Sequence, residues 1–345
     1  MNLHPALLAV IVVDGAAATS LVAAALGAVR VTLGWNGGAS TATQLSLERR
    51  KEEVSFLGRL GLALHALGTL ALLLVINHVL PSIVPGAMCG VGALQAMPGG
   101  QLALAVRGIA LAVLWVWAVV DFLDRSAPLA PLATASSRAL LVSAPVAWVA
   151  AWQTADGLLH VDVQQPVSCC AAVYDLAVVG ASSGQAAVAG RTHATIAGVA
   201  AAVLSAVALW MRWCAKRRLP GLGLVIVWAL AMIVWVGLAG WVLVDVAGPY
   251  LYGVLGHRCP LCFFLPHHLG VGYVAYGSLA VVIGGALILA ASTTAGARCR
   301  DVEPRARSLI STSTLWVVAA MGVFLILIAA PAVWWRLRFG VWIGG

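Results

Sequence analysis

The sequence predicts an all-α polytopic membrane helix bundle of about eight transmembrane helices. Of the 345 residues, 62% are hydrophobic and only 9% are charged, whereas soluble domains usually carry about 25% charged residues. The apolar residues also gather in long runs, and a run of roughly 20 residues is enough to cross the hydrocarbon of a bilayer. Because lipid offers no hydrogen-bond partner to the backbone, such runs must be helical.

Eight runs meet this criterion, and together they predict one integral membrane domain that comprises residues 1–345. The expected helices are 5–29, 57–80, 101–122, 139–159, 194–213, 222–246, 271–292 and 312–334. The first run has no basic segment before it, so we interpret it as a retained helix rather than a cleaved signal peptide. We expect a separate short interfacial helix at Leu45–Glu53 and a partly irregular loop over residues 160–193.

The distribution of basic residues predicts the orientation of the chain. Fifteen of the twenty Lys and Arg residues lie in the first, third, fifth and seventh connections. The positive-inside rule places these connections in the cytoplasm, and therefore both termini and the other connections outside. The abundance of Ala, Val, Leu and Gly favours a bacterial source, so we expect a multi-pass protein of the bacterial inner membrane. The net charge of +8 is then a topological signal, and nucleic acid is not an expected partner.

Cysteines concentrate in the connections that we expect to face outward. Five of the seven lie there, whereas Cys214 and Cys299 lie among cytoplasmic basic residues and have no expected role. The second, fourth and sixth helices each end at a polar residue, and a cysteine follows that residue after 9 to 14 positions. We therefore expect three hairpins to bring thiols together just above the bilayer. The cysteines in question are Cys89, Cys169, Cys170, Cys259 and Cys262.

The sharpest motif is the Cys-Pro-Leu-Cys segment from Cys259 to Cys262. Two residues between the sulfurs allow a reversible disulfide, so this pair is the expected redox dithiol. A second interpretation is a copper or zinc site, because thiolates and imidazoles bind both metals. The metal ligands would be Cys89, Cys169, Cys170, His257, His267 and His268. A third interpretation is that these cysteines form structural disulfides, as in many outward-facing proteins.

Other polar residues near or within the helices predict further roles. His78 and His160, at the outer ends of two helices, are candidate axial ligands of a b-type haem. Asp14, Arg107 and His65 lie within predicted spans, where charged side chains are costly and are usually functional or paired. We expect Asp14 and Arg107 to form a buried ion pair.

These features favour a membrane protein whose outward cysteine and histidine cluster acts in thiol–disulfide chemistry or in metal or haem handling. Quinone-linked disulfide oxidoreductases and haem-maturation proteins share this layout, although no family motif is present along the chain. The expected partners are the lipid bilayer and a periplasmic redox protein or metalloprotein. A membrane subunit of a respiratory complex, with other membrane subunits as partners, is one alternative. A transporter is another, but apart from Asp14 and His65 the centre of the helices is nearly all apolar.

Overall fold

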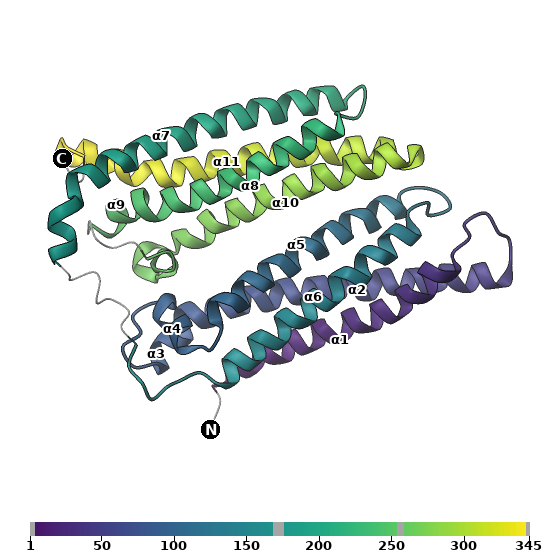
Figure 1. The fold of residues 1–345 in the computed structure, drawn as a ribbon, viewed down its shortest axis with the longest axis horizontal. Coiled ribbons are helices and arrows are strands. Elements are labelled where there is room, and N and C mark those ends of the chain that lie inside the picture. The colour runs from purple at the N-terminus through teal and green to yellow at the C-terminus, as the bar shows by residue number, and fades with distance from the viewer. Residues whose placement is uncertain (1–3, 168–175, 254–258, 343–345) are drawn as a thin grey trace.

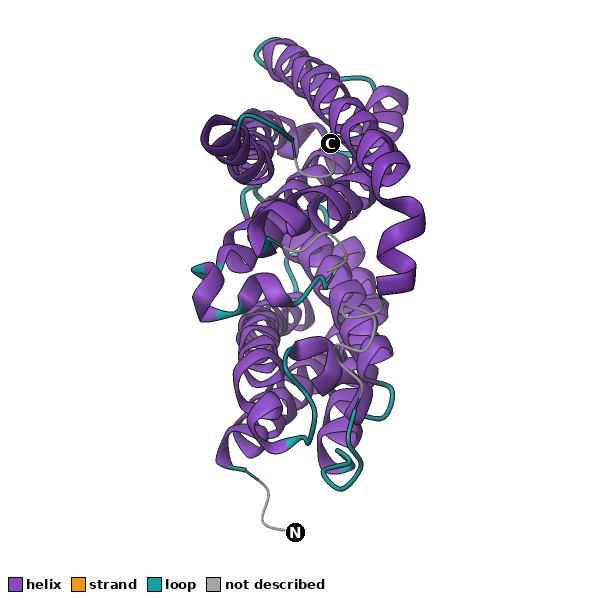
Figure 2. Ribbon diagram, turned by 90° about the vertical axis from the view of Figure 1, so that its left-hand side faces the viewer, coloured by secondary structure: helices purple, strands orange, loops and turns teal. Residues whose placement is uncertain are grey.

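A computed structural model describes residues 4–167, 176–253 and 259–342 of the chain, and the side chains in these ranges outside residues 176–191. The described residues form helices and connecting loops without a strand (Figure 2). Seven of the helices found there are long and apolar enough to cross a membrane. The predicted all-α polytopic bundle is therefore confirmed.

Eight long helices make up the bundle, and each contains most or all of one predicted span. They are α1 (Pro5–Gly34), α2 (Ala42–Leu74), α5 (Gly100–Arg125), α6 (Ala133–Leu159), α7 (Leu176–Ala215), α8 (Leu222–Val242), α10 (Val271–Arg298) and α11 (Glu303–Phe339). Helix α6 is the one that is not among the seven apolar candidates. Its buried residues include the polar side chains Ser136, Ser143 and Thr154, which bond inside the bundle instead of facing lipid.

One expectation about the connections was wrong. Leu45–Glu53 does not form a separate interfacial helix, because α2 begins at Ala42 and continues through this stretch. Burial of Lys51 against α5 and α6 explains why the polar stretch remains part of the long helix. The loop expected to be partly irregular over residues 160–193 is irregular over 161–167 and helical from the start of α7 at Leu176.

The long helices form two halves of four helices each (Figure 1). In the first half, α1 packs on α2 and α6, and α5 packs on α2 and α6. In the second half, α7 packs on α8 and α11, and α10 packs on α8 and α11, so the contacts follow the same chain order. Helices α5 and α10 join the two halves, and the indole Nε1 of Trp115 donates a hydrogen bond to the carbonyl of Gly284 across the joint, at 3.2 Å.

The second and third long helices of each half are connected in a similar way. Helix α2 ends in the π-helical turn η1 (Val75–Val79) and the short helix α3 (Leu80–Ile83). Helix α8 ends in the π-helical turn η2 (Leu243–Ala247) and the short helix α9 (Gly248–Tyr252). A proline is the second residue of each short helix. The two connections emerge at the same end of the bundle as the start of α1, here called the thiol end (Figure 1).

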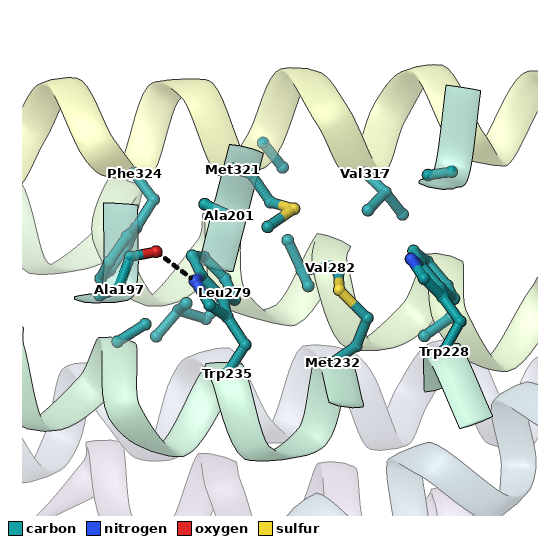
Figure 3. Packing of buried hydrophobic residues seen from close by; sticks show 14 of the residues in the cluster. Ala197, Ala201, Trp228, Met232, Trp235, Leu279, Val282, Val317, Met321 and Phe324 are labelled. Carbon is teal, nitrogen blue, oxygen red and sulfur yellow. Dashed lines mark hydrogen bonds between the residues drawn. The ribbon is translucent and has the colours of Figure 1, made fainter. Parts of the chain in front are cut away.

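The cores of the two halves differ in polarity. The second half has an apolar core in which Trp228 and Trp235 are buried among Met and Phe side chains (Figure 3). The indole of Trp235 donates to the carbonyl of Ala197 at 2.9 Å and packs against Phe324. Among the residues whose side chains the structure describes, the buried charges all lie in the first half: Asp14, Arg107, Lys51, Asp121 and Asp124. Polar chemistry within the membrane region is thus concentrated in the first half.

Candidate functional site

Three cysteines meet at the thiol end of the bundle. Cys89 is the residue before α4 (Gly90–Ala96), and Cys262 begins the 3-10 turn η3 (Cys262–Phe264). The sulfurs of Cys89, Cys259 and Cys262 all lie within 4.8 Å of one another. The Sγ atoms of Cys89 and Cys259 are 3.5 Å apart, although 170 positions separate the two residues. We call these three side chains the thiol cluster.

The two loops that supply the thiol cluster pack closely at Gly90. A Cβ atom at this position would lie 2.5 Å from Asn77 Oδ1 and 2.9 Å from Leu261 Cδ1. Asn77 belongs to the π-helical turn η1, and Leu261 lies between the two cysteines of the second loop. A residue without a side chain is therefore needed after Cys89 for the loops to approach this closely.

Aromatic residues hold the Cys-Pro-Leu-Cys loop in place. The hydroxyl of Tyr252 donates to the carbonyl of Cys259 at 3.0 Å, and that of Tyr276 donates to the carbonyl of Pro260 at 2.9 Å. The ring of Phe264 stacks on Tyr276 with 5.3 Å between centroids, and Phe263 is buried next to it in the chain. These contacts anchor the loop to α9 and α10.

Burial differs among the three thiols. Cys89 is 2% exposed and Cys262 is 5% exposed, whereas Cys259 is partly exposed. Solvent therefore reaches the cluster most easily at Cys259.

Hydrogen bonds favour the thiolate form of Cys259. The side chains of Cys262 and Cys89 share hydrogen bonds with its sulfur, and the backbone N–H groups of Leu261 and Cys262 add to the effect. Together they lower the pKa of Cys259 to about 4 in spite of its partial burial. The pKa of Cys262 is raised, first because its proton is held in the hydrogen bond to Cys259. The cluster thus combines an accessible thiolate with a protonated, buried thiol beside it.

The other cysteines and histidines that were expected to bind a metal are described only in part. Cys169, Cys170 and His257 lie outside the described residues. The rings of His267 and His268, in the 3-10 turn η4 (Pro266–His268), lie against each other with centroids 4.2 Å apart. Neither ring contributes to the three-sulfur group that is found among the described residues.

The two candidate haem ligands each have a partner within the protein. His78 Nε2 lies 2.9 Å from the hydroxyl of Tyr273, and His160 Nδ1 lies 3.2 Å from a carboxylate oxygen of Asp156. Both histidines are exposed at the surface of the protein. Haem ligation by this pair stays a prediction.

Asp14 and Arg107 form an ion pair in the core of the first half, where they are 1% and 0% exposed. Arg107 also donates to the hydroxyls of Thr154 at 3.0 Å and Thr69 at 3.3 Å. His65 is fully buried one helical turn before Thr69, and neither of its ring nitrogens has a hydrogen-bond partner among the described residues. Asp14, Arg107 and His65 therefore lie close together, at one level of the four packed helices of the first half.

Sequence reasoning missed a second buried polar group at the opposite end of the first half. Lys51, expected only as a topological charge, lies 2.6 Å from Asp121 and 3.4 Å from Asp124. Its ammonium also donates to the hydroxyls of Ser55 and Ser136. Asp121 and Asp124, three positions apart at the end of an apolar run, were the feature of the sequence that could have indicated this buried group.

Comparison with known proteins does not assign the chain to a family. No protein-family model matches the chain, and neither a curated protein nor a solved structure matches it. The thiol cluster and the membrane helices are thus the basis for a functional proposal.

Proposed function

We propose that this protein is a thiol–disulfide oxidoreductase of the bacterial inner membrane, with the thiol cluster on the outer, periplasmic side. The observation that supports the proposal is the meeting of three cysteine sulfurs within 4.8 Å, one of which belongs to the partly exposed Cys259. The lowered pKa of Cys259 favours its thiolate form. The orientation rests on the fifteen basic residues in the connections that alternate with the thiol-bearing ones. Both termini would then also face outward.

Cys259 is the nucleophile in the proposed reaction, because the thiolate is the reactive form of cysteine. Its sulfur attacks one sulfur of a client disulfide, which forms a mixed disulfide and releases the other client sulfur as a thiolate. Cys262 or Cys89 then loses its proton and attacks Cys259, which releases the second client thiolate. Two electrons pass from the protein dithiol to the client disulfide, and the reverse sequence oxidises a client dithiol.

The geometry suits this resolving step. A disulfide has a sulfur–sulfur distance of about 2.05 Å, and Cys89 and Cys259 start 3.5 Å apart. A shift of about 1.5 Å, within the range of a side-chain rotation, is sufficient to form the bond. The client would be an exported protein that carries an accessible dithiol or disulfide.

Serine substitution tests the proposal directly. Reduced protein in detergent is mixed with a disulfide-bonded protein substrate, and the release of substrate thiols is followed with time. We expect Cys259→Ser to lower the rate at least 100-fold, because it removes the attacking thiolate. The matched control is the double variant Cys214→Ser/Cys299→Ser, whose changes lie away from the thiol cluster and should leave the rate unchanged. Equal rates for the wild type and Cys259→Ser would overturn the proposal.

A further inference from the structure

We infer that the reduced thiol cluster is also a binding site for Cu(I), in which Cys89, Cys259 and Cys262 supply three thiolate ligands. This site takes a metal ion instead of a client protein, and it requires only the reduced cluster. It therefore does not depend on exchange activity. Three features of the structure carry the inference: the spacing of the sulfurs, the chemistry of the ligands and the enclosure of the cluster.

The spacing fits an ion placed between the three sulfurs. With metal–sulfur bonds of about 2.3 Å, three ligands around one ion in a plane lie about 4.0 Å from one another. The cluster is compatible with this value, since the sulfurs of Cys89 and Cys259 are 3.5 Å apart and all three sulfurs lie within 4.8 Å of one another. Small adjustments of the side chains would therefore bring all three sulfurs to bonding distance.

The ligand chemistry favours a soft ion. Thiolates select Cu(I) and Zn(II) among the common metals. Structural zinc sites are almost always tetrahedral with four ligands, whereas Cu(I) is stable with three soft ligands. The group found among the described residues consists of three sulfurs and contains no carboxylate or imidazole. Of the two metals, Cu(I) is the better match to these ligands.

The surroundings of the cluster would protect such an ion from water. Cys89 and Cys262 are almost completely buried, and Phe263 and Phe264 are buried beside them. The backbone N–H groups of Leu261 and Cys262 stabilise negative charge on the sulfur of Cys259, as they would for a metal-bound thiolate. Cys259 is partly exposed and gives the ion a way in.

Copper binding and disulfide formation would exclude each other. A disulfide between Cys259 and either neighbour removes two of the three ligands. Bound Cu(I) would also connect the two four-helix halves, because Cys89 belongs to the first half and the other two ligands to the second. Each thiol that enters the site as a thiolate releases its proton, so binding is linked to proton release.

The test uses a background variant in which only the three cluster cysteines remain, with Cys169, Cys170, Cys214 and Cys299 replaced by Ser. Reduced protein in detergent is titrated with Cu(I) without oxygen, in competition with a coloured Cu(I) chelator. We expect one equivalent to bind, and X-ray absorption at the copper edge to detect three sulfur neighbours. Adding Cys89→Ser should lower the affinity at least 10-fold, because two sulfurs then remain.

Three results would overturn the inference: less than one equivalent of copper held against the chelator, two or fewer sulfur neighbours, or an unchanged affinity in Cys89→Ser. Tighter binding of Zn(II) than of Cu(I) would also overturn it. If the background variant does not fold, X-ray absorption of the copper-loaded natural sequence decides the ligand number. A failure of the proposed exchange activity can be distinguished from a failure of copper binding. The Cys89→Ser variant keeps the Cys259 and Cys262 pair, so its reduction of a disulfide substrate can be assayed independently of its copper affinity.

Discussion

The ion pair between Asp14 and Arg107 should be among the most important polar contacts for the stability of the first half. Both side chains are almost completely buried, and the pair joins α1 to α5. Replacing Asp14 alone with Leu would leave the guanidinium of Arg107 charged and without its carboxylate in the core. Breaking a buried pair in this way costs about 3–5 kcal/mol. This lowers the equilibrium constant for folding by a factor of roughly 100 to 5,000.

Replacing both residues should be much less harmful. The double variant Asp14→Leu/Arg107→Met removes both charges and fills the space with apolar side chains. The hydroxyls of Thr69 and Thr154 would still donate to the carbonyls one turn earlier in their own helices, at 2.7 and 2.8 Å. No polar group that the pair satisfied is then left without a partner. We therefore expect most of the lost stability to return, as for other buried pairs replaced by apolar groups.

The assay is unfolding of the reduced protein in detergent micelles, by heat or by added denaturing detergent. The matched control is Glu53→Ala, which removes the exposed partner of Arg50 and should change stability by at most about 1 kcal/mol. The reasoning would be refuted if Asp14→Leu cost no more than the control. It would also be refuted if the double variant were as unstable as the sum of the two single variants.

Three other changes have expected results. Gly90→Ala should lower the yield of an oxidised Cys89–Cys259 crosslink, because the new Cβ would meet Asn77 and Leu261, whereas Gly108→Ala has open space around it and should not. Trp235→Ala should cost about 3–5 kcal/mol in the same unfolding assay, and Trp235→Phe less, since a ring then still packs near Phe324. In the metal-free protein, alkylation of Cys259 should stay fast from pH 8 down to about pH 5 and slow as the pH falls through about 4. If the alkylation rate of Cys259 already fell as the pH was lowered through about 8.5, as for an ordinary thiol, the lowered pKa of Cys259 would be contradicted.

The helices could be predicted from the sequence, but their ends could not. Lipid demands an apolar run with an internally bonded backbone, and this requirement can be read from residue types alone. The start of α2 depends instead on tertiary contacts. Lys51 is buried against Asp121 on α5 and Ser136 on α6, so a stretch that looks solvated in the sequence continues a buried helix.

The candidate site could be predicted only in part, because some of its residues come together through packing between distant parts of the chain. The Cys259 and Cys262 pair is a local motif, and its spacing alone indicates a possible dithiol. The participation of Cys89 was one possibility among several, because it depends on packing between residues 170 positions apart. The expected contribution of His267 and His268 also depends on the local fold. In the turn η4 the two rings lie against each other, and the ring of His268 also lies against Tyr252.

The position of the thiol cluster follows from the repeated order of elements in the two halves. In each half the second and third long helices are connected at the thiol end, after a π-helical turn and a short helix that contains a proline. The third long helices, α5 and α10, pack against each other between the halves. The two equivalent loops are therefore brought to the same place above the joint. A single loop could supply only a pair of thiols, and the third sulfur, on which Cu(I) binding would depend, requires both halves to be packed together.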